Sequence, residues 1–96
     1  MIDVRRIKHK GLKLLWQKGD ERRLRVDWVA KSKRILAALN AATGPDELNL
    51  PGFGWNELEG KRKGYYSVKV SGNWRITYRW DSDGPFEINL EDYHGK

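Results

Sequence analysis

The sequence predicts an α+β domain in which two N-terminal helices pack on a small, twisted, mostly antiparallel sheet. Apolar residues recur at helical spacing in the first half of the chain and alternate with polar residues in the second half. Helices that come early and strands that come late are typical of α+β proteins. With 96 residues the chain has room for one core, so we expect a single domain over residues 1–96.

The first half is predicted to hold one short strand and two helices. Residues 2–7 alternate in part, which favours a first strand. Residues 11–16 have leucine and tryptophan at helical spacing, and a Gly-Asp pair ends this helix. A longer helix runs from Asp27, a suitable N-cap residue, to about Ala42, where Thr-Gly-Pro stops it. Residues 46–54 then form a loop.

The second half is predicted to hold four strands in a meander. Turn residues separate the expected strands, which cover residues 55–58, 65–70, 74–80 and 86–90. The apolar positions of the third strand include two tryptophans and a tyrosine on one uniformly apolar face. We therefore expect these rings to belong to the core and not to a platform for stacking nucleotide bases.

The parity of the apolar residues predicts the register of the two later hairpins. A three-residue loop over 71–73 sets apolar residues opposite one another, namely Val70 with Trp74, Val68 with Ile76 and Tyr66 with Tyr78. Asn73 then closes the loop, where asparagine tolerates a left-handed backbone.

In the second hairpin, a five-residue loop over 81–85 likewise sets apolar residues opposite one another. It sets Trp80 opposite Phe86, Tyr78 opposite Ile88, Ile76 opposite Leu90, and Asn73 opposite Tyr93. On the polar face it places Thr77 opposite Asn89 and two ion pairs, Arg79 with Glu87 and Arg75 with Glu91.

The distribution of charge favours a polyanionic partner. The formal net charge is +6, and the basic residues are concentrated in two segments. Residues 1–34 carry 12 basic and 4 acidic side chains, and residues 61–80 carry 6 basic side chains and no acidic one. Nucleic acid is the usual partner of such segments, whereas the alternative is a solvated surface that happens to be basic.

Composition excludes several other classes of protein. The chain has no cysteine, which excludes a disulfide scaffold and any cysteine-ligated metal. Its apolar runs are short and its first residues do not resemble a signal peptide, so we expect a cytoplasmic protein without membrane contact. No histidine and carboxylate cluster has ligand spacing, so we expect neither a metal nor another cofactor.

Three neighbouring residues near the C-terminus could carry acid–base chemistry. His94 has a side chain that titrates near neutral pH, Asp92 can orient it, and Tyr93 can donate a hydrogen bond. The alternative interpretation is that this segment is a solvated tail.

A basic turn could bind phosphate. Arg62 offers a fork of donors that matches phosphate oxygens, and Lys61 and Lys63 flank it. Tyr65 lies on the polar face of its strand and could stack on a base. A plain solvated loop is the alternative for this turn.

Several segments in combination point to one known family. Residues 60–68 read GKRKGYYSV, residues 72–78 read GNWRITY, and residues 91–94 read EDYH, with further similarity in KHKGL, ILAAL and LNLPG. In these segments the chain resembles the HigB-type toxins of the RelE/ParE superfamily, which belong to bacterial toxin–antitoxin systems. The resemblance covers nearly the whole chain and implies the same fold of two helices on a twisted antiparallel sheet.

The resemblance implies an mRNA interferase that depends on the ribosome. Such toxins enter the ribosomal A site, cut the mRNA codon there and stop translation, and a HigA-type helix-turn-helix antitoxin neutralises them. The family's catalytic segment, strand start and basic loop position match Asp92, Tyr93 and His94, then Asn73 and Arg75, then Arg62.

One departure from the family concerns Asn56 and Glu59. The family often has a histidine and a cation at these two positions. Asparagine cannot exchange a proton near neutral pH, so the sequence predicts a comparatively mild toxin.

The chemistry of RNA is compatible with such a site. RNA is cut without metal when its own 2′-hydroxyl attacks the adjacent phosphate, and the protein then supplies acid–base and electrostatic help. The available groups are His94 with Asp92 as acid or base, Arg75 and Arg62 as phosphate ligands, and Tyr93 and Asn73 as hydrogen-bond donors. Two alternatives stay open, a non-catalytic ParE-like inhibitor of a protein target and a plain RNA-binding module.

Overall fold

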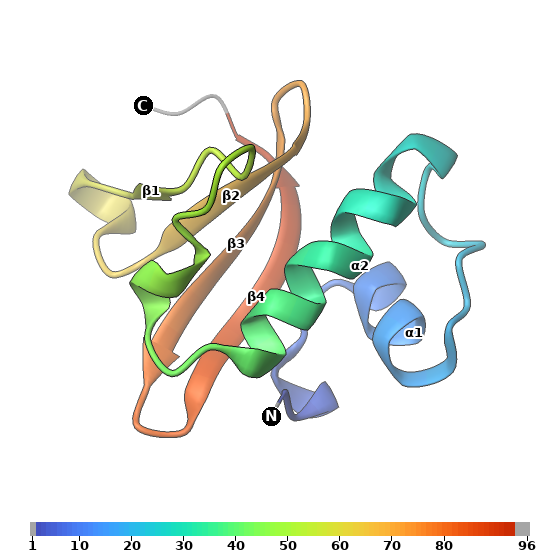
Figure 1. Cartoon of the computed structure of the whole chain (residues 1–96), viewed down its shortest axis with the longest axis horizontal. Coiled ribbons are helices and arrows are strands. Elements are labelled where there is room, and N and C mark those ends of the chain that lie inside the picture. The colour runs from blue at the N-terminus through green and yellow to red at the C-terminus, as the bar shows by residue number, and fades with distance from the viewer. Residues whose placement is uncertain (1, 94–96) are drawn as a thin grey trace.

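The computed structural model describes residues 2–93, which form a sheet covered on one face by helices (Figure 1). The helices are α1 (Lys10–Lys18) and α2 (Val26–Ala41). The strands are β1 (Asn56–Glu57), β2 (Tyr66–Ser71), β3 (Trp74–Asp81) and β4 (Gly84–Asp92), and they form one antiparallel sheet in that order. The predicted α+β class and arrangement are confirmed.

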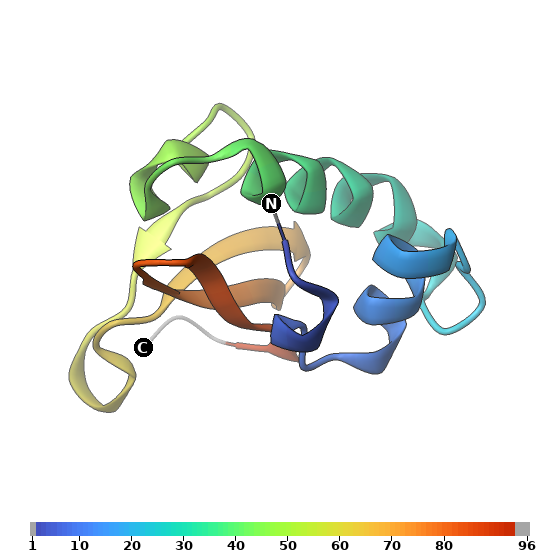
Figure 2. The same cartoon turned by 90° about the horizontal axis from the view of Figure 1, so that it is seen from below.

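The core lies between α2 and the sheet face beneath it. Helix α2 runs along that face, and α1 packs beside α2 toward one end of the molecule (Figure 2). The central side chains are almost wholly inaccessible to solvent, among them Ile35, Leu36, Leu39, Val68, Ile76, Tyr78 and Ile88. The tryptophans of β3 pack against this core, as predicted. Within residues 2–93 neither helix has the length and apolar character needed to cross a membrane.

Both helices form close to where they are predicted. The His9 side chain caps α1 by accepting a hydrogen bond from the Leu12 N–H at 3.3 Å, and Gly19 ends α1 with a left-handed φ of 68°. The N-cap prediction for Asp27 is wrong, because α2 begins one residue earlier and has Arg25 as its N-cap. The Asp27 carboxylate lies in the first turn, 3.3 Å from Arg25 Nε.

The predicted strand over residues 2–7 is also wrong. Asp3 accepts a hydrogen bond from the Arg5 N–H at 2.9 Å, and this local bond folds Val4–Arg6 into a 3₁₀ turn. Ile7 alone pairs with the sheet in strand fashion within residues 2–93, through a single parallel bridge to Ile88 of β4. The N-terminal segment therefore lies along the outer edge of β4 without becoming a strand.

The first hairpin follows the predicted register in its middle and departs from it at the turn. Val68 pairs with Ile76 and Tyr66 with Tyr78, as expected. The pair of Val70 with Trp74 does not form, because Ser71 takes the place opposite Trp74 and the register shifts between Lys69 and Ser71. The loop has two residues, and Gly72, with φ of 56°, supplies the left-handed conformation predicted for Asn73.

The second hairpin contains a bulge that the sequence pattern did not reveal. Ile76 pairs with Leu90, Thr77 with Asn89 and Arg75 with Glu91, as predicted. Beyond Thr77 the register shifts, so that Arg79 lies opposite Phe86, Trp80 opposite Pro85 and Asp81 opposite Gly84. Glu87 adopts a positive φ of 49° there, which absorbs the extra residue. The five-residue loop, the Trp80–Phe86 pair and the Arg79–Glu87 pair are therefore wrong.

Candidate functional site

Polar side chains gather on the sheet face that is turned away from α2. Successive strand residues point to opposite faces, so the residues between the core positions of β3 and β4 share this outer face. They include Arg75, Thr77, Arg79, Asn89 and Glu91. The loop that connects β1 to β2 lies beside this face (Figure 2).

Arg62 and Glu91 form the centre of this outer face. Arg62 comes from the 3₁₀ turn Gly60–Arg62, and its guanidinium donates to Glu91 Oε1 at 3.1 Å and Oε2 at 2.9 Å. The Thr77 hydroxyl donates a further hydrogen bond to the same carboxylate. Both charged side chains are largely shielded, with 30% of Arg62 and 26% of Glu91 exposed. This two-point geometry fixes the guanidinium more firmly than a surface ion pair would.

Two tyrosine rings flank the guanidinium of Arg62. Its central carbon lies 4.5 Å from the centroid of the Tyr65 ring and 5.6 Å from that of Tyr93. The guanidinium carbon of Arg79 also lies over the Tyr65 ring, 5.2 Å from its centroid, and the Tyr65 hydroxyl donates a hydrogen bond to Glu87 at 2.7 Å. Cation–π contacts of this kind contribute about 0.5–1 kcal/mol at exposed sites. Tyr65 thus holds arginines in place.

The electrostatics of this group keep its ion pair charged. Burial by itself raises the pKa of Glu91, but the hydrogen bonds from Arg62 and Thr77 outweigh it, so that the pKa lies below its ordinary value. The hydrogen bond to Glu91 raises the pKa of Arg62, and the bond to Glu87 raises the pKa of Tyr65. Arg62 and Glu91 are therefore both ionised at neutral pH.

The end of β4 and the turn before β3 lie together, as the sequence predicts. The Tyr93 N–H donates to the Asn73 carbonyl at 2.8 Å, and Asp92 lies opposite Trp74. Asn73, Asp92 and Tyr93 are thereby brought to one end of the sheet. The predicted catalytic residue His94 lies outside the described residues.

Arg75 and Asn56 meet at a different point, the carbonyl oxygen of Gly54. Arg75 Nη1 donates to this oxygen at 3.2 Å, and Asn56 Nδ2 lies 3.4 Å from it. The backbone of Arg75 lies opposite Glu91, yet the Glu91 carboxylate binds Arg62. The cross-strand ion pair predicted for Arg75 is therefore replaced by a contact with the loop before β1.

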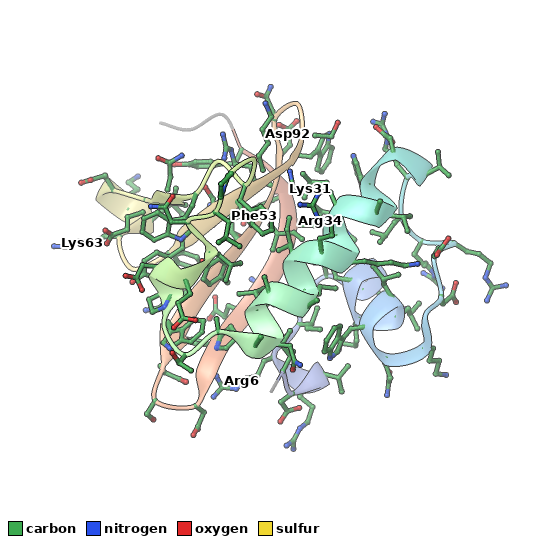
Figure 3. All side chains as sticks on the ribbon, viewed as in Figure 1. Arg6, Lys31, Arg34, Phe53, Lys63 and Asp92 are labelled. Carbon is green, nitrogen blue, oxygen red and sulfur yellow. The ribbon has the colours of Figure 1, made fainter. Side chains whose placement is uncertain are left out.

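Lys61 and Lys63 stand on the exposed part of the loop between β1 and β2. Figure 3 shows Lys63 pointing outward from the molecule. This placement suits contacts with an extended anionic partner and not with one enclosed phosphate.

Sequence reasoning missed Glu91 as the partner of Arg62, and with it the supporting role of Thr77. The strand parity placed Glu91 and Thr77 on the same face, which was the available signal. The turn that brings Arg62 over that face has no comparable signature, because its path depends on the packing of a loop.

Comparison with known proteins identifies the class to which this fold and polar face belong. The chain belongs to the family described as the RelE-like toxin of type II toxin–antitoxin system HigB, which matches residues 5–94. A relative is Endoribonuclease HigB from Proteus vulgaris, which is 38% identical over 91 residues that cover 95% of this chain and 99% of that protein. The family resemblance stated from the sequence is confirmed, and membership of a toxin–antitoxin family implies an antitoxin partner.

Proposed function

We propose that this HigB-family toxin is an endoribonuclease that cuts mRNA in the ribosomal A site and thereby inhibits translation and growth. The kinship with Endoribonuclease HigB from Proteus vulgaris supports the reaction class. The observation that carries the proposal is the pre-positioned guanidinium of Arg62, held by Glu91 beside Tyr93 of the C-terminal segment. A fixed cation next to candidate acid–base groups is the arrangement that phosphate chemistry requires.

The proposed reaction uses the substrate's own hydroxyl as nucleophile and needs no metal ion. The 2′-oxygen loses its proton and bonds to phosphorus, the bond from phosphorus to the 5′-oxygen breaks, and that oxygen gains a proton. The products are a 2′,3′-cyclic phosphate and a 5′-hydroxyl. General acid–base help accelerates such a step by roughly 10²–10⁴-fold.

The residues of the site take the following roles in this proposal. His94, oriented by Asp92, exchanges the proton with the substrate. Arg62 has five N–H donors by its chemistry, and its two bonds to Glu91 leave about three for a phosphate. Of the remaining candidates, Arg75 also binds the phosphate, and Tyr93 and Asn73 donate hydrogen bonds near the nucleotide. Lys61 and Lys63 contact the RNA backbone, and Tyr65 lies against a base. Asn56 lies at the edge of the site.

The partners in this proposal are the ribosome, its A-site mRNA and a HigA-type helix-turn-helix antitoxin. A toxin that acts on translating ribosomes works in the cytoplasm. The sparse set of catalytic groups favours dependence on the ribosome, because the ribosome would hold the mRNA in line for attack. Such positioning contributes up to about 7–11 kcal/mol to lowering the barrier.

Primer extension on one mRNA, with and without translating ribosomes, tests the proposal. We expect cleavage within codons in the translated sample and almost none in free RNA. A substrate with a 2′-deoxyribose at the cut position should resist cleavage, and the ends should be a cyclic phosphate and a 5′-hydroxyl. Equal cleavage of free and translated mRNA would contradict dependence on the ribosome, and 5′-phosphate ends would contradict the proposed chemistry.

A further inference from the structure

Four cations from three elements surround residues 52–54, beside the outer face already described. They are Lys31 and Arg34 of α2, Lys69 of β2 and Arg75 of β3, and we call them the Phe53 basic patch. Lys31 Nζ donates to the Gly52 carbonyl at 2.8 Å, and Lys31 and Arg34 lie over the Phe53 ring at 5.5 and 5.8 Å (Figure 3). Lys69 and Arg75 bind the carbonyls of Phe53 and Gly54 through a main-chain N–H and a guanidinium, respectively.

No carboxylate balances this patch within residues 2–93. The ion pairs of the described chain involve other cations, namely Arg5, Arg6, Arg22, Arg25, Lys33 and Arg62. Burial lowers the pKa of Lys31, and the neighbouring charges of Arg34 and Lys69 lower it further. Like charges brought this close repel one another, and an anionic ligand would remove that repulsion.

The patch lies at the end of the sheet that carries the C-terminal segment. Trp74 of β3 lies opposite Asp92 and packs on Trp28 of α2, with ring centroids 4.7 Å apart. Arg75 follows Trp74 directly and contacts the carbonyl of Gly54. In Figure 3 Asp92, Lys31 and Arg34 follow one another from the top of the view toward its middle. A chain of phosphates that crosses the patch would thus arrive at Asp92 and Tyr93.

We propose that the Phe53 basic patch binds the sugar–phosphate backbone of RNA and guides the strand toward the C-terminal segment. This inference rests on the proposed function only in taking RNA as the substrate class. RNA fits better than an acidic protein surface, because the Phe53 ring that Lys31 and Arg34 cover is itself buried and offers a protein partner no exposed aromatic surface. Phosphate contacts need charges alone, whereas protein interfaces draw most of their affinity from buried aromatic and aliphatic side chains.

The test compares a patch variant with a control of equal charge. The patch variant is K31Q/R34Q/K69Q, which leaves Arg75 intact because Arg75 is a candidate for the reaction itself. The control is K10Q/K18Q/R23Q, which removes two lysines and one arginine that are exposed on and near α1. Fluorescence anisotropy then measures binding to a short single-stranded RNA and to vacant ribosomes over a range of salt concentrations.

We expect the patch variant to bind at least about tenfold more weakly than the control at physiological salt, and the slope of log affinity against log salt to fall by about 2, which corresponds to three lost phosphate contacts. Weaker binding to the short RNA alone identifies the bound backbone as mRNA, whereas weaker binding to vacant ribosomes, which hold no mRNA, identifies a contact with ribosomal RNA. Either result supports the patch.

Patch and control variants that bind both probes alike would overturn the inference. A patch variant that binds RNA normally but no longer binds the purified antitoxin would overturn it too, in favour of a protein partner. Binding is measured without cleavage, so a wild-type protein that binds through the patch but does not cut contradicts only the proposed function. If the triple variant does not fold, the exposed Lys69→Gln alone should still lower the slope by about 0.7.

Discussion

The guanidinium of Arg62 is restrained from three directions, by the carboxylate of Glu91 and by the rings of Tyr65 and Tyr93. A side chain with many rotamers normally loses entropy when it binds a phosphate. Here the protein has already restricted those rotamers before the substrate arrives. The carboxylate leaves about three N–H donors free, so that Glu91 acts on the reaction by positioning Arg62.

Glu91→Gln tests this positioning role. The pKa of Glu91 is lowered in the folded protein, so its contribution to stability is fully present above its ordinary value of 4.5 and is lost as the pH falls through the folded value. The variant should therefore lower the free energy of unfolding by about 1–2 kcal/mol at pH 7 and by much less at pH 3. It should also lower the rate of cleavage with little change in RNA binding.

Chemical denaturation between pH 3 and pH 7 checks the first expectation, and single-turnover cleavage checks the second. Thr77→Val is a useful comparison, because it removes the other hydrogen bond to Glu91 but leaves the charge in place. A constant difference in stability at every pH would mean that the Glu91 charge contributes nothing.

His94→Ala should abolish growth inhibition and leave the fold intact. The apolar alternation of β4 ends at Leu90, which is buried, four positions before residue 94 in the sequence. Induced expression measures the first effect and a thermal melt of the purified protein the second. A variant that stays fully toxic would remove His94 from the proposed mechanism.

Asn56→His should raise the rate of cleavage. Asn56 is exposed on β1 and contacts the Gly54 carbonyl that Arg75 also binds, so a larger ring has room and lies near a cation of the site. Imidazole exchanges protons near neutral pH, and such a group contributes roughly 10²–10⁴-fold where it acts. Glu59 would stabilise the charged ring if it lies close, so the gain should depend on pH.

Single-turnover cleavage on programmed ribosomes across a range of pH measures this gain. Asn49→His introduces the same ring at another exposed position and serves as control. Equal rates for both variants and the wild type would show that position 56 lies outside the catalytic centre.

At the scale of elements, the bulge in β4 decides which side chains meet on the outer face. The register shift around Glu87 removes the predicted contact with Arg79 and turns Glu87 toward the hydroxyl of Tyr65. The central pairs of both hairpins were predictable, because apolar parity specifies them. The register shifts at Ser71 and Glu87 were not predictable. The alternation of apolar and polar residues does not show where a single extra residue is inserted into a strand, because the cost of that insertion depends on local backbone strain.

The site was predictable to a similar extent. Asn73, Asp92 and Tyr93 are adjacent because they terminate paired strands, and strand pairing follows from the pattern. The partners of Arg62 and Arg75 depend on the paths of two loops, and those paths follow from packing that no local sequence signal encodes.

Gly11→Ala in α1 should destabilise the protein, although alanine is the better helix former by about 1 kcal/mol. A Cβ at Gly11 would lie 2.9 Å from Leu24 Cδ2 and 3.1 Å from the Arg23 carbonyl oxygen. Both contacts are too close, and the second involves backbone that cannot easily move. We expect a net loss of about 1–3 kcal/mol in urea denaturation. Gln17→Ala, at an exposed position of the same helix, should be neutral or stabilising.

At the scale of the whole molecule, the charge count of the sequence overstates the free positive surface. Several arginines of the basic segment 1–34 are paired with an aspartate two residues away, as in Arg5 with Asp3 and Arg22 with Asp20. Such pairs neutralise part of the positive charge of the segment. Among the cations of this segment that form no ion pair within residues 2–93, Lys31 and Arg34 lie where the fold adds Lys69 and Arg75 to them.

The bridge between Ile7 and Ile88 joins the beginning of the chain to its last strand. The Lys8 N–H donates to the Ile88 carbonyl at 2.7 Å, so the N-terminal segment has no sheet partner until β4 has been synthesised. Contacts of such long sequence separation form late in folding. During translation a nascent chain therefore has neither a closed core nor Glu91 and Tyr93 beside Arg62. The order of synthesis itself delays the assembly of the site until β4 and Tyr93 have been made.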